Sequence, residues 1–188
     1  MEDAILIAGN RSGSASATWK NYSIESSLAL PAYAKASLPA SMSSHETILF
    51  LCTGNYYRSR FAEELFNHLA KEKGLNWRAD SAGLEVEKWR SYNPGTMSVH
   101  TVELLEAMDI MPVGRNRPER QFDPEEIDEV SRCIALSESE HKPMVERMHP
   151  ELLPRIEFWT VEDLHLETAA NALPMIVDAV EKLVESLS

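Results

Sequence analysis

Two residues six positions apart, Cys52 and Arg58, are of types that can do chemistry together. Both belong to the segment Cys-Thr-Gly-Asn-Tyr-Tyr-Arg-Ser, residues 52–59. Gly54 in this segment permits a tight turn. A loop entering a helix points successive N–H groups at one spot, where the helix dipole adds positive charge, so the segment predicts a cradle for phosphate. The same dipoles favour the nucleophilic thiolate form of Cys52. The planar fork of Arg58 suits two phosphoryl oxygens at once.

The sequence around this segment predicts the elements that position it. Residues 47–52 form a short continuous apolar run, which is typical of a strand buried on both faces of a parallel sheet. Thr53, Gly54 and Asn55 signal a turn, and apolar residues recur at helical spacing from Ser59 onward. Strand, tight loop and helix are therefore expected in direct succession.

The remaining segments continue this alternation and predict an α/β fold. We expect three layers: a short, about four-stranded parallel sheet, helices on both of its faces, and a phosphate-binding loop after the first strand. Ligands of such sheets bind beyond the carboxyl ends of the strands, which is where Cys52 lies. The further predicted strands are 77–81, 132–136 and 155–159, and the further predicted helices are 99–108, 140–148 and 173–187.

The composition limits the partners. With 30 acidic and 18 basic residues and a net charge of -12, the chain is unlike a nucleic-acid-binding protein. Its two cysteines, Cys52 and Cys133, are expected to be free thiols in a reducing cytoplasm, with Cys133 a small apolar residue of a core strand. No apolar run approaches the ~20 residues that span a bilayer, so we expect a soluble protein without a membrane partner. The scattered histidines predict no metal, and we expect no cofactor.

Residues 1–45 differ from the rest of the chain. They are rich in Ser and Ala and lack a sustained period of 2 or 3.6, so we expect a poorly ordered N-terminal extension ahead of a working domain at 46–188. Two alternatives stay open: a signal peptide around 28–36, which the acidic start of the chain disfavours, and a biological start at Met42.

Two segments carry a resemblance to a known family. Cys52-Thr-Gly-Asn-Tyr-Tyr-Arg-Ser59 resembles the Cys-x-Gly-Asn-x-x-Arg-Ser signature of low-molecular-weight protein tyrosine phosphatases, and Asp80-Ser-Ala-Gly83 resembles their Ser-Ala-Gly turn. The resemblance covers residues 46–188. It implies a phosphatase that hydrolyses phosphotyrosine or related aryl phosphate monoesters through a phosphocysteine intermediate, acting on a phosphorylated protein or a small aryl phosphate. It predicts no oligomeric state.

The resemblance also implies roles for individual residues. Cys52 would be the nucleophile, Arg58 would bind the equatorial oxygens, Ser59 would hydrogen-bond the thiolate, and Asn55 and Ser81 would brace the loop. Asp163 would be the general acid that protonates the leaving group. The other residues expected to bind phosphate or support the loop are Thr53, Gly54, Tyr56 and Tyr57.

The chain departs from the family pattern at several positions. Leu164 follows Asp163 where the family has a proline, which leaves Glu162 as an alternative acid. Arg117 falls where the family often has a histidine that braces the loop. Aromatic walls for the substrate ring are expected from Tyr56, Tyr57, Trp89 and Tyr92, although ordinary packing would also explain these side chains.

Two other functions compete with the phosphatase. A thioredoxin-coupled arsenate reductase shares this fold but relays a disulfide through further cysteines, and Cys133 is the one spare thiol of this chain. A non-catalytic phosphate- or phosphopeptide-binding module would keep the cradle and lack turnover, and the altered acid loop is its motivation.

Overall fold

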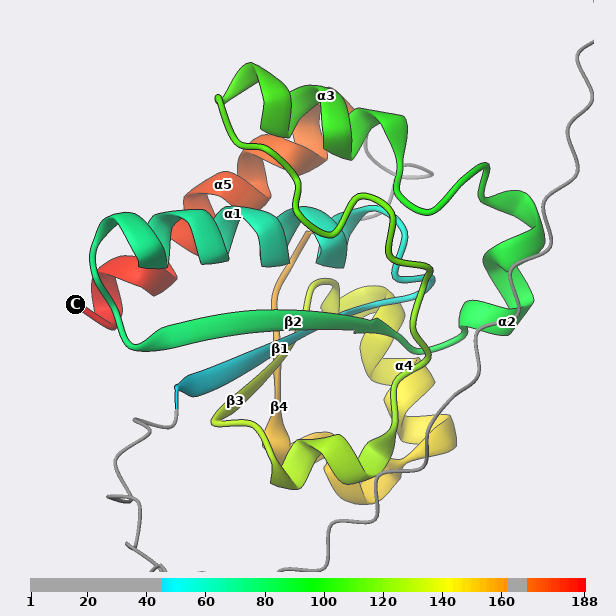
Figure 1. The fold of residues 1–188 in the computed structure, drawn as a ribbon. Coiled ribbons are helices and arrows are strands. Elements are labelled where there is room, and N and C mark those ends of the chain that lie inside the picture. The colour runs from blue at the N-terminus through cyan, green and yellow to red at the C-terminus, as the bar shows by residue number, and fades with distance from the viewer. Residues whose placement is uncertain (1–44, 162–168) are drawn as a thin grey trace, which may run out of the picture. The chain divides into compact units, whose positions relative to one another are not determined.

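The centre of the fold is a sheet whose neighbouring strands are all parallel, in the order β2-β1-β3-β4 (Figure 1). The computed structural model of the 188-residue chain describes residues 45–161 and 169–188. All of these residues belong to one compact unit. The strands are β1 (Glu46–Cys52), β2 (Trp77–Gly83), β3 (Arg132–Ala135) and β4 (Ile156–Phe158).

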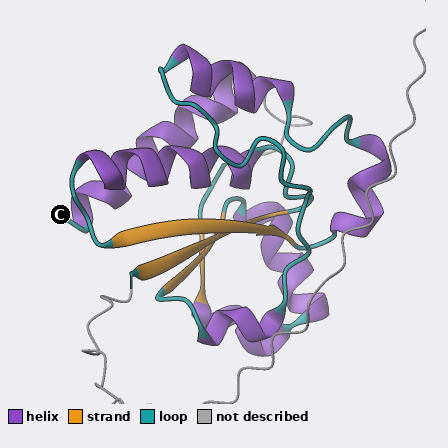
Figure 2. Cartoon of the chain, viewed as in Figure 1, coloured by secondary structure: helices purple, strands orange, loops and turns teal. Residues whose placement is uncertain are grey.

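Helices cover both faces of this sheet, as the purple and orange layers of Figure 2 show. Three lie on one face: α1 (Arg58–Glu72), α3 (Val99–Ala107) and α5 (Ala169–Ser186). On the other face lie α4 (Glu138–Met148) and two short 3-10 helices, η2 (Pro124–Asp128) and η3 (Pro150–Arg155). A further short helix, α2 (Val86–Trp89), continues into the 3-10 turn η1 (Arg90–Tyr92) beyond the carboxyl end of β2.

The strand β1 is central because its side chains alternate between two apolar cores. Ile48 and Phe50 pack with residues of α1, α3 and α5, whereas Leu49 and Leu51 pack with residues of α4, η2 and η3. Side chains of a strand alternate between its two faces, so a strand buried on both sides needs the continuous apolar run found here. The carboxyl end of β1 is therefore fixed by packing from both faces.

The predicted fold class is confirmed, with its strands and helices in the expected order. What the sequence did not predict is the short α2 and the 3-10 helices, which contain too few residues for a helical period to appear. The predicted extension, residues 1–45, lies outside the described residues except for His45. Among residues 45–161 and 169–188, no helix combines the length and apolarity needed to cross a membrane.

Candidate active site

The predicted phosphate loop joins the carboxyl end of β1 to the start of α1 at Arg58. The first turn of α1 has no acidic residue, and the residue before the helix makes no side-chain cap. The backbone N–H groups of this turn are thus suited to an anion. Asn55 turns the chain with a φ of 51°, a left-handed conformation that Asn adopts more readily than most residues.

Cys52 lies at this junction with two hydrogen-bond partners on its sulfur. The Asn55 backbone N–H donates to Sγ over 3.2 Å, and the Ser59 hydroxyl lies 3.0 Å from Sγ. Asn55 Nδ2 donates to the same Ser59 oxygen over 3.1 Å, so the hydroxyl hydrogen remains available for the sulfur. When Cys52 is a thiolate it can only accept, and both contacts then stabilise its charge.

The side chain of Asn55 fixes the loop to two other segments of the chain. Its Nδ2 also donates to Ser81 Oγ over 2.7 Å, and its Oδ1 accepts from the backbone N–H of Arg120 over 2.9 Å. Asn55 is fully buried, so these contacts satisfy polar atoms that water cannot reach. The structure therefore brings together Cys52, Asn55, Ser59 and Ser81, the residues that the resemblance places in one site.

Ser81 is in turn held by a network of charged side chains, Glu63, Asp80 and Arg117. Ser81 Oγ donates to Glu63 over 2.6 Å, and Arg117 donates both to Glu63 over 2.5 Å and to Asp80 over 2.6 Å. Burial raises the pKa of Glu63, and the charge of Arg117 offsets this only in part. Burial acts in the same direction on Asp80, but hydrogen bonds from Arg117 and Ser81 outweigh it and lower its pKa. Arg117, which falls where the family often has a histidine, thus contacts both Ser81 and its partner Glu63.

A close backbone contact makes Gly83 a constrained position of the site. A Cβ atom at Gly83 would lie 2.8 Å from the backbone nitrogen of Asn55 and 2.6 Å from a methyl group of Val86. At Gly54 the nearest atom would be 3.5 Å away, which is ordinary contact. Glycine is therefore required at Gly83, the last residue of β2, where the loop packs closely. The turn of the loop itself is made by Asn55, and Gly54 has room for a side chain.

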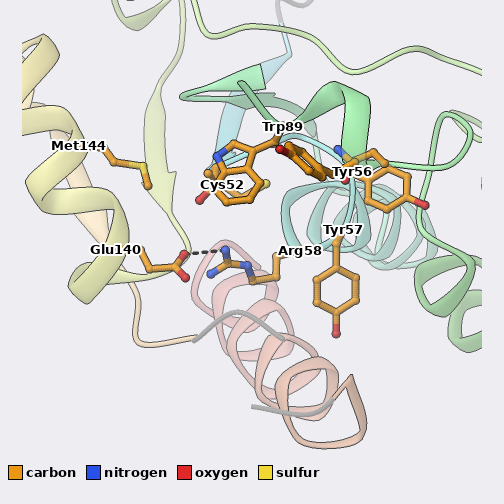
Figure 3. Close-up of a pocket in the computed structure, with 11 residues that line it drawn as sticks. Cys52, Tyr56, Tyr57, Arg58, Trp89, Glu140 and Met144 are labelled. Atoms are coloured by element: carbon orange, nitrogen blue, oxygen red, sulfur yellow. Dashed lines mark hydrogen bonds and ion pairs between the residues drawn. The ribbon is translucent and has the colours of Figure 1, made fainter. Parts of the chain in front are cut away.

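Cys52 and the loop line a pocket of about 450 Å³ (Figure 3). Aromatic side chains form part of its wall: Trp89 and Tyr92 pack at 5.9 Å between ring centroids, and Tyr56 donates its hydroxyl to the Pro94 carbonyl over 2.8 Å. Tyr57 differs from these three, because its ring belongs to the apolar core and points away from Cys52 and Trp89. The other residues lining the pocket are Thr53, Gly54, Arg58, Asn93, Glu140 and Met144.

The side chain of Arg58 is 2% exposed, and its guanidinium is held by two acceptors from outside its own loop. Nη2 donates to Glu140 Oε2 over 2.7 Å, and Nη1 donates to the Val161 carbonyl over 3.1 Å. Glu140 was not among the site residues predicted from the sequence. A signal for it existed, because Glu140 lies in the first turn of the helix after β3, at the same carboxyl edge of the sheet as Cys52.

The predicted general acid, Asp163, and its alternative, Glu162, lie outside the described residues. The last described residue before them, Val161, contacts Arg58 through its carbonyl.

Cys133 lies in β3 within the apolar core between the sheet and α4. It is 2% exposed, and burial raises the pKa of its thiol to about 12. Both cysteines are free thiols.

Comparison with known proteins gives two curated relatives from Bacillus subtilis. A protein-arginine-phosphatase is 45% identical over 58 residues, which cover 31% of this chain and 35% of that protein. The low molecular weight protein-tyrosine-phosphatase YfkJ is 36% identical over 92 residues, 48% of this chain and 55% of that protein. The matches thus span about a third and about half of the lengths of these relatives.

A solved structure extends the likeness over more of the chain. The low molecular weight protein tyrosine phosphatase from T. tengcongensis is 27% identical, with a TM-score of 0.62, and the match covers 76% of this chain and 99% of that one. The family model described as low molecular weight phosphotyrosine protein phosphatase matches residues 47–161, which include β2, β3, β4, all of β1 except Glu46, and the whole loop between β1 and α1. The chain therefore belongs to the low molecular weight phosphotyrosine protein phosphatase family.

Proposed function

We propose that the protein is a phosphatase that hydrolyses phosphotyrosine or related aryl phosphate monoesters through a phosphocysteine at Cys52. The observation that carries the proposal is the placement of the Cys52 sulfur. It lies at the end of a buried strand, before an uncapped helix N-terminus, with the donors of Asn55 and Ser59 directed at it and a pocket beside it. A nucleophile and an oxyanion cradle thus share one loop.

The proposed chemistry has two steps at this sulfur. In the first, the Cys52 thiolate attacks phosphorus, an S–P bond forms, and the P–O bond to the leaving group breaks while Asp163 gives that oxygen a proton. In the second, water attacks phosphorus, Asp163 takes a proton from the water, and the S–P bond breaks to release phosphate and the thiolate. Arg58 binds the phosphoryl oxygens throughout, and Ser59 stabilises the thiolate each time it carries charge.

The pocket wall supports an aryl substrate. Tyr56, Trp89 and Tyr92 present aromatic surface around the entrance to Cys52, and such surface packs well against a phenyl ring. The relative named as a tyrosine phosphatase supports the same class.

A second candidate substrate is phosphoarginine, and two observations favour it. One of the two curated relatives described above, 45% identical over 58 residues, is a protein-arginine-phosphatase. In addition, the pocket contains the carboxylate of Glu140, whose Oε2 binds Arg58 and whose side chain is 22% exposed. A carboxylate beside aromatic rings also suits the planar cation of a guanidinium leaving group.

The competing arsenate reductase relay has little support. It needs a second cysteine that can reach the first, and Cys133 is a buried core residue with a pKa of about 12. The non-catalytic binding module differs from the phosphatase only in turnover, so an activity measurement separates the two.

The test is hydrolysis of a chromogenic aryl phosphate at mildly acidic pH, with and without vanadate. We expect vanadate-sensitive turnover that is lost in Cys52→Ser and falls strongly in Asp163→Asn, with Glu162→Gln as the matched control. A larger loss in Glu162→Gln would move the acid to that residue. Binding of vanadate without turnover would instead support the binding module.

The same preparation distinguishes the two substrates. Two peptides of one sequence, carrying either phosphotyrosine or phosphoarginine at the same position, would be compared by kcat/KM. The peptide with the higher value defines the leaving group, and phosphoarginine preference would replace the aryl phosphate proposal while leaving the role of Cys52 unchanged.

A further inference from the structure

The phosphate-binding arginine is anchored from outside its own loop. Glu140 Oε2, in the first turn of α4, accepts from Arg58 over 2.7 Å, and the Val161 carbonyl beyond β4 accepts over 3.1 Å. In Figure 3 the Glu140 carboxylate and the Arg58 guanidinium face each other beside Cys52. The carboxylate of Glu140 thus binds the guanidinium of Arg58, although the two residues are 82 positions apart in the sequence. Arg58 is the cation that the proposed function assigns to oxyanion binding.

Glu140 is itself held in place by the start of α4. Its backbone N–H donates to the Ser137 side chain over 3.3 Å, an N-terminal cap of the helix. The neighbouring His141 is fully buried, and its Nδ1 accepts from the Ser137 backbone N–H over 3.0 Å. The proton of a neutral His141 therefore lies on Nε2, which is 3.4 Å from Glu140 Oε2.

The environment keeps His141 neutral. Burial, and then the charge of Arg58, lower its pKa well below 6.5. The charges at this end of the pocket are thus a cation on Arg58 and an anion on Glu140, with His141 as a neutral neighbour. A buried guanidinium needs such a partner, because a charge without one is costly to remove from water.

An arginine side chain has many rotamers, and an ordered phosphate clamp must select one of them. A clamp fixed before the substrate arrives spends no binding energy on ordering that side chain. Glu140 and Val161 both accept hydrogen bonds from the guanidinium, and together these two contacts hold it in one orientation.

We propose that Glu140 is a positioning residue for Arg58, holding the guanidinium at the wall of the pocket so that an incoming phosphoryl group meets it already oriented. The inference rests on the proposed function, in which Arg58 binds the phosphoryl oxygens. It predicts that removal of Glu140 weakens oxyanion binding. If Glu140 instead competed with the substrate for Arg58, its removal would tighten that binding, so the sign of the change decides between the two roles.

The measurement is calorimetric binding of vanadate to the full-length chain. We expect the Kd to rise about tenfold in Glu140→Ala and less in Glu140→Gln, because a glutamine oxygen still accepts from Arg58. The matched control is Glu138→Gln, which removes the same charge from the same turn of α4, where Glu138 pairs with Lys142 over 2.8 Å. We expect no change there. Unchanged or tighter binding in Glu140→Ala would overturn the proposal.

A double-mutant cycle separates positioning from a general effect on folding. In an Arg58→Lys background the fork that Glu140 orients is gone, so Glu140→Gln should change the Kd much less than in the parent chain. An equal loss in both backgrounds would overturn the proposal. Thermal unfolding of each variant checks that the binding differences come from folded protein.

Vanadate binding keeps this test apart from the test of turnover. If the Glu140 variants behave as expected but no substrate is hydrolysed, the phosphatase proposal fails and the positioning role stands. If turnover is normal and vanadate binding is insensitive to Glu140, the reverse holds.

Discussion

The two cysteines of this chain lie on neighbouring strands of one sheet and are almost equally buried, with Cys52 3% and Cys133 2% exposed. Their surroundings differ in one respect. Cys52 ends its strand, where the Asn55 N–H and the Ser59 hydroxyl reach its sulfur. Cys133 lies opposite Leu49 inside the sheet, among apolar side chains. Polar donors at the end of a strand, and not exposure, thus distinguish a candidate nucleophile from a packing residue.

The largest effect that this comparison predicts is on activity. Cys52→Ser should lower kcat for an aryl phosphate at least about 1,000-fold, because the hydroxyl is a far weaker nucleophile. Cys133→Ala should leave kcat within about twofold, since Cys133 does not line the pocket. Steady-state kinetics on both variants measure the difference, and a comparable loss in the two would break the comparison.

The second effect concerns alkylation. At pH 8 a thiol whose pKa is about 12 is a thiolate in roughly one molecule in 10,000, so iodoacetamide should label Cys52 at least about 100-fold faster than Cys133. The slow reaction at Cys133 should speed up about tenfold with each pH unit, because its thiolate fraction grows tenfold per unit below the pKa. Mass spectrometry of the digested protein follows both sites. Equal labelling of folded protein would contradict the assignment.

The third effect is smaller and tests the donors themselves. Ser59→Ala removes one hydrogen bond to the Cys52 sulfur, and such a bond to a charged group contributes about 1.5 kcal/mol. In the low-pH part of the rate profile, where the alkylation rate of Cys52 still rises with pH, alkylation should therefore slow about tenfold. Cys133 provides the internal control, because its rate should stay the same. If both rates fell, a general change of structure would explain the loss better than the missing donor.

The smallest effect is on stability, and here the substitution at Cys133 is expected to cost more than the one at Cys52. Cys133→Ser buries a hydroxyl in an apolar core and should lower the free energy of unfolding by about 1–3 kcal/mol. Cys52→Ser should cost less than about 1 kcal/mol, since its polar partners can hydrogen-bond the new oxygen. Urea unfolding measures both, with Cys133→Ala separating the cost of polarity from that of lost volume. Equal costs would show that the two environments are alike.

The sequence predicts the segment that carries Cys52 much better than the distant residues that hold this segment in place. The strand, turn and helix around Cys52 follow from a continuous apolar run, Gly-Asn and a helical period, all within one stretch of chain. Glu63 was missed because an acidic residue on an amphipathic helix is usually on the solvent side, whereas here it is buried against Arg117. The position of Glu140 at the start of the helix after β3 was a signal for the site, but its pairing with Arg58 was not, because the two residues are distant in sequence and no local pattern reports such a pair.

The contact between Asn55 and Arg120 has a consequence for the order in which the molecule is made. The backbone N–H of Arg120 completes the bonding of the loop, yet it follows Asn55 by 65 residues, and Arg120 also accepts from Gly83. During synthesis from the N-terminus, Cys52 and Asn55 are made well before Arg120, and a loop of 65 residues must then close before the contact can form. The nascent protein therefore passes through a period in which Cys52 lacks its finished surroundings, and the loop that presents the Asn55 and Ser59 donors to its sulfur is complete only once Arg120 has been made.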